Sequence, residues 1–354
     1  MRDSLFNTLV DAGQSPIALE GVCGGIATLL PKLGRVLALF PGESQNSLIW
    51  VNPRLYAAAG ASELIEEAGW KNFGGDRTWL GPERDIFVRD LADPWNTYEV
   101  PSGIDPGNYG LEWAGNSVKM RNSFSVVNHR LRRECSFQLT KQIIMIPNPL
   151  PQESMGAEIQ AVKYIGYDQR TRLTLTSLEP AFQVDVWNLI QVPSGGEAII
   201  PTLSETWPRD HFEPTGESHL LVDADGVWFK IDAKERHKIS ITAAASTGRV
   251  GYLRRLAGDT WSLIVRNITV NPSGPYIDVP WDSNDEAGYA IQCYNDDGTL
   301  GDFGELEYHS TALDTNQARE LADCSQVWAF EGPAECIKSV GKSLLGVKLN
   351  ERAR

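Results

Sequence analysis

The stretch "TRLTLTSLEPAFQVDVWNLIQVPSGGEAIIP" (residues 171–201) decides the fold class, because it holds two extended segments, a turn cluster and no helix between them. Residues 171–178 alternate between polar and apolar types. Residues 181–192 are rich in β-branched and aromatic side chains, and a Pro-Ser-Gly-Gly turn follows. Consecutive strands joined by short turns are typical of antiparallel sheets.

The same pattern of strands and turns continues along most of the chain. Clusters such as "VDADG" and "NPSGP" mark turns, and helical spacing occurs in two places, residues 56–69 and 332–346. Further strands are expected at residues 135–146, 226–232, 238–246 and 260–270. Many strands without intervening helices predict an all-β fold, a large β-sandwich of two antiparallel sheets with a few short helices.

The 354 residues show no repeat of fixed period and no linker long enough to divide the series of strands. A single domain over residues 1–354 is therefore expected, with a core at about residues 20–346 and a frayed C-terminal tail.

The chain is acidic, with 32 Lys and Arg against 46 Asp and Glu and a formal net charge of −14. A surface of this sign repels nucleic acid and anionic membranes, so neither is an expected partner. No signal-peptide pattern or long apolar run occurs, which predicts a soluble cytoplasmic protein. The 5 cysteines show no metal-ligand or redox spacing and are interpreted as buried free thiols.

Residues 72–87, "NFGGDRTWLGPERDIF", combine a glycine pair that permits a tight turn, charged residues and a tryptophan. The two glycines permit a sharp turn, which could present Asp76, Arg77 and Trp79 from a fixed loop. Such a loop suits a sugar, because an indole can cover its C–H face while charged groups bind its hydroxyls. A tight turn closed by Asp76 and Arg77, with Trp79 in the core, is the structural alternative.

The string "GGDRTWLGPE" (74–83) resembles the GG-x-x-x-W-x-x-PE motif of an uncharacterised bacterial family in the galactose mutarotase-like (aldose 1-epimerase-like) superfamily. Three later segments resemble a middle strand with its hairpin, a late ELE-containing strand and a closing strand with a helix in the same group. They are residues 181–201, 294–312 and 325–346. The resemblance spans roughly residues 45–346.

The resemblance implies a β-supersandwich with a sugar-sized cleft on its concave face. In active members of the superfamily, a glutamate on a late strand takes the proton of the anomeric hydroxyl while a histidine protonates the ring oxygen. Glu307 matches this glutamate. Arg77 and Glu83 would then bind sugar hydroxyls, and Trp79 or Trp187 would stack on the ring. Further candidate substrate-binding residues are Asp76, His129, Asn188 and Glu305.

The segment "FGELEYHS" (303–310) is expected to be a strand whose period of two puts Phe303, Glu305, Glu307 and His309 on one face. Two carboxylates and an imidazole can form an acid–base cluster, because nearby like charges raise a carboxyl pKa toward working pH. A solvated strand face is the alternative.

The expected proton donor is missing from its usual place in the superfamily. Mutarotases have a histidine in an N-H-x-x-W-N-L-like stretch, whereas "DVWNL" (185–189) keeps the Trp-Asn pair without a histidine. His309 and His211 are the candidate acids, and His211 lies in a Pro- and charge-rich loop of the kind that rims clefts. His219 and His237 are interpreted as surface or packing residues.

No nucleotide-binding, serine-hydrolase or zinc-protease motif occurs, so no organic cofactor is expected. Residues 280–290 are acidic enough to suit calcium but lack a complete loop signature, and no metal ligand is assigned. The leading interpretation is a carbohydrate-active protein, a monomer or homodimer, that binds a monosaccharide or a sugar end. A non-catalytic sugar-binding protein, or a glycoside lyase or hydrolase that uses Glu83 and Glu307, are the alternatives.

Overall fold

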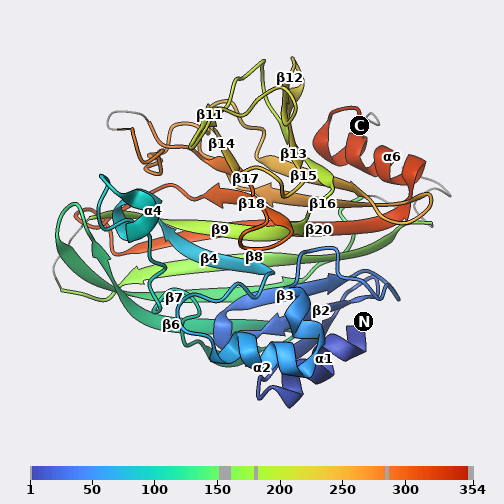
Figure 1. Ribbon diagram of the computed structural model, residues 1–354, viewed down its shortest axis with the longest axis horizontal. Coiled ribbons are helices and arrows are strands. Elements are labelled where there is room, and N and C mark those ends of the chain that lie inside the picture. Colours follow the sequence, from blue (N-terminus) through green and yellow to red (C-terminus); the bar gives the residue numbers. More distant parts are fainter. Residues whose placement is uncertain (1, 151–160, 179–181, 284–286, 350–354) are drawn as a thin grey trace.

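The computed structural model describes residues 2–150, 161–178, 182–283 and 287–349, and it consists mainly of two ten-stranded sheets (Figure 1). Neighbouring strands in both sheets run antiparallel. The predicted all-β class, with two large antiparallel sheets, is therefore confirmed.

The first sheet carries the candidate site, and its strands lie in the order β1, β2, β3, β4, β9, β18, β17, β14 and β11, with β19 beside β9. Their bounds are Ile17–Glu20 (β1), Ile26–Leu30 (β2), Arg35–Phe40 (β3), Asp76–Gly81 (β4), Gln183–Pro193 (β9), Phe303–His309 (β18), Ile291–Asn295 (β17), His237–Ile241 (β14), Arg209–Asp210 (β11) and Leu313–Asp314 (β19).

The second sheet has the order β12, β13, β10, β15, β16, β20, β8, β7, β6 and β5. Its strands are Leu220–Val222 (β12), Gly226–Ile231 (β13), Gly196–Pro201 (β10), Arg249–Arg255 (β15), Thr260–Ile268 (β16), Glu320–Pro333 (β20), Lys163–Leu175 (β8), Arg133–Met145 (β7), Ser117–Asn128 (β6) and Gly110–Ala114 (β5).

Most strand boundaries lie within two residues of the expected ones, and the two largest differences have local reasons. β8 begins at Lys163, well before residue 171, because residues 164–169 are buried without alternation. β14 ends at Ile241 rather than at residue 246, because the chain turns there and Ala245 N donates a hydrogen bond to Thr242 O. Ala181, the first residue of another expected strand, lies outside the described residues.

The inner faces of the two sheets meet in a large apolar core. Side chains alternate along each strand, so only every second residue enters this core. In β18, Leu306 and Tyr308 are buried in it, and the Tyr308 hydroxyl donates a hydrogen bond to Asp323 of the second sheet. The opposite face of the first sheet is therefore free for other contacts.

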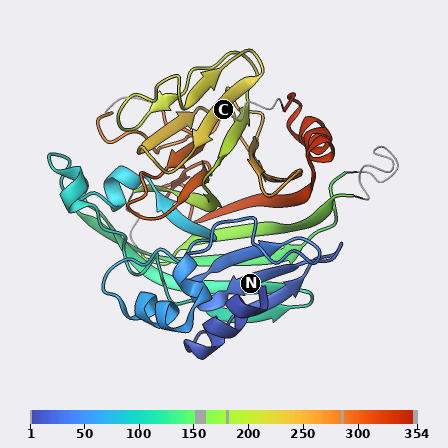
Figure 2. The same cartoon turned by 45° about the vertical axis from the view of Figure 1, so that its right-hand side comes forward.

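The two predicted helices are present as α2 (Ala58–Glu66) and α6 (Ala334–Leu345). Helix α1 (Arg2–Asp11) was not predicted, because its only buried apolar residues are Leu5 and Leu9. The N-terminal helices lie below the sheets in both views, and α6 lies above them at the upper right (Figure 1 and Figure 2). The remaining short helices are α3 (Glu83–Ile86), α4 (Pro94–Thr97), η1 (Pro31–Leu33) and η2 (Pro53–Tyr56). No helix of the described residues is long and apolar enough to cross a membrane.

Two smaller expectations need correction. Val347 and Leu349 are buried against α6 and its sheet, so the chain stays packed beyond residue 346, and residues 350–354 lie outside the described residues. Cys23 and Cys324 are exposed, although all cysteines were expected to be buried.

Candidate functional site

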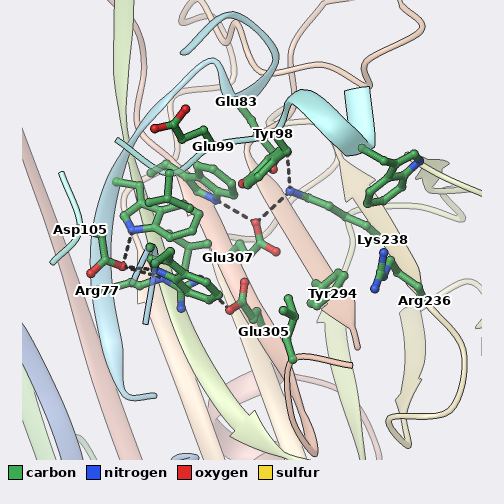
Figure 3. A pocket seen from close by; sticks show the side chains of 18 of the residues that line it. Arg77, Glu83, Tyr98, Glu99, Asp105, Arg236, Lys238, Tyr294, Glu305 and Glu307 are labelled. Atoms are coloured by element: carbon green, nitrogen blue, oxygen red, sulfur yellow. Dashed lines mark hydrogen bonds and ion pairs between the residues drawn. The ribbon is translucent and has the colours of Figure 1, made fainter. Parts of the chain in front are cut away.

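A pocket of about 780 Å³ lies on the outer face of the first sheet (Figure 3). Its floor consists of five adjacent strands, β4, β9, β18, β17 and β14. The floor side chains are Arg77, Trp79, Trp187, Leu189, Lys238, Tyr294, Phe303, Glu305 and Glu307. Loop residues and the helices α3 and α4 provide the walls, among them Trp70, Glu83, Trp95, Tyr98, Asp105, Phe212, Arg236 and Trp281.

Strand β4 enters the floor directly after the two glycines. Gly75 has a φ of 80°, and a Cβ at this position would lie 2.4 Å from Val36 O of β3, so the close approach requires glycine. Side chains then alternate, and Arg77 and Trp79 line the pocket. The predicted loop is therefore wrong: these residues lie on a strand between β3 and β9, and Asp76 points to the other face.

Glu307 lies on the floor and is 1% exposed. Its Oε2 accepts a hydrogen bond from Trp187 Nε1 (2.8 Å) and lies 3.3 Å from Lys238 Nζ. Both contacts go to Oε2, so Oε1 receives no hydrogen bond from the described residues. Burial raises the pKa of Glu307 to about 7; Lys238 opposes this rise, and the carboxylates of Glu305 and Glu83 add to it.

Lys238 joins two carboxylates across the floor. Its Nζ lies 3.2 Å from Glu83 Oε2 and 3.3 Å from Glu307 Oε2. Burial would lower the pKa of Lys238, but Glu307 and Glu83 outweigh burial and raise it. The ammonium therefore stays charged. Tyr98 completes this group, because its hydroxyl donates a hydrogen bond of 3.0 Å to Glu83 Oε1.

Arg77 holds a second carboxylate group at the other side of the floor. Its NH2 lies 2.8 Å from Glu305 Oε1, and its Nε lies 3.9 Å from Asp105 Oδ2. Asp105 also accepts hydrogen bonds from Arg35, Trp70 and Trp79. Although burial opposes it, the guanidinium groups of Arg35 and Arg77 lower the pKa of Asp105. The buried Nε and NH1 of Arg77 have no hydrogen-bond partner in the described part of the chain.

The two floor tryptophans already carry neighbours over their ring faces. The Trp79 ring stacks with Phe87 (centroids 5.0 Å apart) and lies 4.3 Å from Arg77 Cζ. The Trp187 ring stacks with His309, and Lys238 Nζ lies 4.6 Å from its centroid. These indoles therefore act through their N–H groups, which orient Asp105 and Glu307, rather than as open faces.

An aromatic rim stands at the wall of the pocket and consists of Trp95, Phe212 and Trp281. The ring centroids of Trp95 lie 4.7 Å from Trp281 and 5.0 Å from Phe212. Trp95 is 52% exposed, and Arg236 Cζ lies 5.0 Å from its ring. The buried Trp281 Nε1 has no hydrogen-bond partner among the described residues. The rim therefore offers a partly exposed aromatic surface at Trp95.

His309 shares the floor side of β18 but does not line the pocket. Its side chain is fully buried, with Nδ1 3.0 Å from Asp185 Oδ1 and Nε2 3.5 Å from Asp278 Oδ2. Although burial opposes it, the Asp185 and Asp278 carboxylates raise the pKa of His309. The geometry makes His309 a support for Trp187 rather than a group in contact with a ligand.

Two other histidine candidates also lie away from the pocket. His211 is buried, and its Nε2 contacts Ser240 Oγ. Burial, followed by the charge of Lys238, lowers the pKa of His211 well below its ordinary value. His129 is half-buried near α3, where its backbone N–H donates to Asp85 O. All five histidines lie in the described part of the chain, and none lines the pocket.

Asp76 and Asn188 lie on the opposite face of the same strands. Asp76 accepts hydrogen bonds from Arg266 and Tyr167 of the second sheet. Asn188 Oδ1 accepts from Thr78 Oγ1 and Gln169 Nε2, both at 2.7 Å. Neither side chain lines the pocket.

Six of the predicted residues line the pocket together: Arg77, Trp79, Glu83, Trp187, Glu305 and Glu307. The other five lie outside its lining: Asp76, His129, Asn188, His211 and His309. Sequence reasoning missed Lys238, Tyr98 and Asp105. Alternation in the expected strand 238–246 puts Lys238 on the same face as Ser240 and Thr242, and this was the signal that could have pointed to it.

No metal is assigned to the pocket. Its described lining has no histidine or cysteine, and the floor carboxylates already pair with Arg77 or Lys238. Part of the acidic stretch considered for calcium, residues 284–286, lies outside the described residues.

Comparison with known proteins adds a family and fold-level similarities. Residues 27–353 match a family described as "Family of unknown function (DUF6786)". No curated protein matches the sequence. Similar solved structures include a galactose mutarotase related enzyme from Lactobacillus acidophilus (8% identity, TM-score 0.45, covering 88% of this chain and 96% of that chain). A GalM/aldose epimerase homologue from C. elegans has 10% identity and a TM-score of 0.41, and the match covers 90% of this chain and 99% of that chain. An alpha-galactosidase from Lactobacillus brevis has 10% identity and a TM-score of 0.38, and the match covers 93% of this chain and 42% of that chain.

Proposed function

The chain belongs to the DUF6786 family, whose function is unknown, and we propose from the pocket itself that it binds the end of a carbohydrate, with Glu307 as the proton-transfer group. The observation that carries the proposal is a floor of paired charges, with unused hydrogen-bonding atoms on Arg77 and Glu307, beside an exposed aromatic rim.

This combination matches the two surfaces of a sugar. Hydroxyl groups accept strong hydrogen bonds from charged donors, and the Arg77 guanidinium lines the floor. The C–H face of a sugar ring packs on an open aromatic face, and Trp95 of the rim provides one. Stacking therefore belongs to the rim in this proposal, rather than to Trp79 or Trp187.

The size of the pocket favours the end of a longer saccharide over a free monosaccharide. A volume of about 780 Å³ lies in the upper part of the range of about 300–1,000 Å³ that ligand pockets occupy. The terminal sugar would lie on the charged floor, and the next sugar would pack on the aromatic rim.

Glu307 is the group in the pocket that can exchange a proton near neutral pH, because its pKa of about 7 leaves both forms populated. Lys238 keeps its proton and can stabilise negative charge beside it. Since no imidazole lines the pocket, the glutamate-and-histidine pair of mutarotation has no second member here. Binding with one proton-transfer carboxyl is therefore the better interpretation.

A panel of mono- and oligosaccharides tests the proposal by saturation-transfer NMR and calorimetry. We expect saturable binding of an oligosaccharide that weakens in Arg77→Met, a variant that loses the free N–H groups. Polarimetry on the bound sugars, wild type against Glu307→Gln, tests proton transfer. Absence of binding across the panel rejects carbohydrate recognition, and equal polarimetric rates in both proteins reject the role of Glu307 while leaving binding intact.

Glycoside cleavage is a second candidate, and one observation favours it. Glu83 and Glu307 contact the same Lys238 Nζ, at 3.2 Å and 3.3 Å, so their Oε2 atoms lie no farther apart than the sum of these distances. Carboxyl separations of about 5–5.5 Å suit retaining hydrolases and about 6.5–9.5 Å inverting ones. Release of nitrophenol from aryl glycosides, lost in both Glu83→Gln and Glu307→Gln, would establish this activity.

A further inference from the structure

We propose that His219, Glu235 and His237 form a binding site for a transition-metal ion such as Zn²⁺, next to the pocket. Each residue offers one ligand atom, and these atoms lie within 4.8 Å of one another. The two imidazole rings have centroids 4.9 Å apart. Zinc takes histidine nitrogen and carboxylate oxygen ligands at about 2.0–2.2 Å and is mostly four-coordinate, which leaves one position for water. Two nitrogen ligands out of three disfavour calcium and magnesium.

The backbone that presents two of these ligands is held by Asn295 of β17. Asn295 Oδ1 accepts hydrogen bonds from the backbone N–H groups of Asp232 (2.9 Å) and Ala233 (3.0 Å), and its Nδ2 donates to Glu235 O (2.8 Å). Asn295 is fully buried and pairs with His237 in the first sheet. The connection between β13 and β14 is therefore fixed before any ion binds, which lowers the ordering cost of a site there.

His219 is oriented by a carboxylate, as metal-binding histidines commonly are. Its Nε2 lies 3.2 Å from Asp232 Oδ1, and its backbone O accepts a hydrogen bond from Lys230 N (2.8 Å). If Nε2 carries the proton of the Asp232 contact, Nδ1 presents a lone pair. Ser218 Oγ lies 3.0 Å from Nδ1, and this hydroxyl can rotate to release it.

His237 is nearly buried and has one ring nitrogen beside the carboxylate of the cluster. It is 5% exposed, and its Nδ1 is buried without a hydrogen-bond partner among the described residues. Buried polar atoms are satisfied in the great majority of cases. Its Nε2 lies 3.2 Å from Glu235 Oε2, and the Glu235 side chain is 65% exposed. An ion can therefore enter from solvent on the Glu235 side.

Without an ion, the same residues form two ordinary histidine–carboxylate pairs, His219 with Asp232 and His237 with Glu235. The position of the cluster also gives an ion a consequence for the pocket. Arg236 and Lys238 flank His237 in the sequence, and both line the pocket. Bound metal would therefore hold the end of β14 that carries the pocket ammonium.

Titration of metal into the chelator-stripped, untagged full chain tests the site. Calorimetry with Zn²⁺ should show one ion per chain, and Co²⁺ should give the intense visible absorption of a tetrahedral nitrogen and oxygen site. His219→Gln and His237→Gln should weaken binding by at least about tenfold, and Glu235→Gln should weaken it as well. His129→Gln, a half-buried histidine outside the cluster, is the matched control and should bind as wild type does.

Absence of saturable Zn²⁺ binding in the folded wild-type chain would overturn the proposal. Wild-type affinity in both His237→Gln and Glu235→Gln would also overturn it. Because the Glu235 side chain is exposed, its variant keeps the wild-type fold and remains a valid test if a histidine variant fails to fold.

Discussion

Asp76 and Arg77 are neighbours in β4, yet they belong to two regions that use buried charge differently. On the core face, both oxygens of Asp76 have protein partners, Arg266 and Tyr167. On the pocket face, both contacts of Glu307 go to one oxygen, and two nitrogen atoms of Arg77 have no hydrogen-bond partner among the described residues.

The difference shows how structural and functional charges can be told apart within one sheet. Burying charge is costly unless it is paired and hydrogen-bonded. The carboxylate on the core face meets that requirement inside the protein. The pocket face leaves hydrogen-bonding atoms unpaired on side chains that line open volume.

The largest expected effect separates the two faces by stability. Asp76→Asn leaves the buried Arg266 without its counter-charge, so we expect the unfolding free energy to fall by about 3–5 kcal/mol in urea denaturation. Glu320→Gln, which breaks the exposed pair with Arg172, is the control and should change it by about 0–1 kcal/mol. A loss below about 1 kcal/mol in Asp76→Asn would remove the distinction between the two faces.

The pH dependence of stability tests the unusual charge of the pocket face. The folded pKa of Glu307, about 7, lies above its ordinary value of 4.5, so between these two pH values the folded state keeps a proton that the unfolded state has lost. The contribution of Glu307 to stability is therefore present below pH 4.5 and falls by up to about 3 kcal/mol as pH rises to 7.

Urea denaturation of wild type and Glu307→Gln at about pH 5 and about pH 8 isolates this component. The wild type should lose more stability than the variant as pH rises. Identical pH profiles would show that Glu307 titrates normally, and the pocket face would then resemble the protein surface.

Substitution of Lys238 tests the charge of the pocket face through a smaller expected effect, a shift in the pKa of Glu307. Lys238 opposes the rise in the pKa of Glu307, so Lys238→Met should move the midpoint of the Glu307 titration upward, by on the order of one pH unit. Carbon NMR of the Glu307 carboxyl measures the midpoint. Arg236→Met is the matched control, because Arg236 lines the same pocket but pairs with Asp297. A midpoint unchanged by Lys238→Met would contradict the electrostatic account.

The smallest effect concerns the aromatic rim. Trp95 is half exposed but packs against Trp281 and Phe212, so Trp95→Ala should lower the unfolding free energy by about 0.5–1.5 kcal/mol. It should weaken oligosaccharide binding by about 0.5–1.5 kcal/mol and leave monosaccharide binding unchanged. Trp113→Ala, at another exposed tryptophan outside the pocket, should change neither. Equal losses for both ligand lengths would place the terminal sugar, rather than the next one, on the rim.

Much of the fold could be predicted from the sequence, because alternation and turn residues are local signals. The strands expected at residues 181–192 and 303–310 correspond to β9 and β18, and alternation places Glu305 and Glu307 on one face. The same alternation holds in residues 76–81, where the two glycines had instead suggested a loop. Applied there, it would have separated Asp76 from Arg77, and it likewise separates Trp187 from Asn188.

The rest of the site depends on sheet order, which no local signal contains. Lys238 and Glu83 are 155 positions apart in the sequence, and they meet because β14 follows β17 and β18 across the floor. Asp105 and Tyr98 come from irregular wall segments without a motif. The burial of His309 beside Asp185 and Asp278 is also a tertiary effect. It excludes His309 from the pocket, although alternation had favoured this histidine as the proton donor.

The most direct test of the central claim is the titration of the Glu307 carboxyl by carbon NMR, with and without saccharide, using Glu307→Gln to assign the signal. The account predicts a midpoint near pH 7 that shifts when an oligosaccharide binds. A midpoint near the ordinary value of 4.5, unmoved by every saccharide tested, would contradict it.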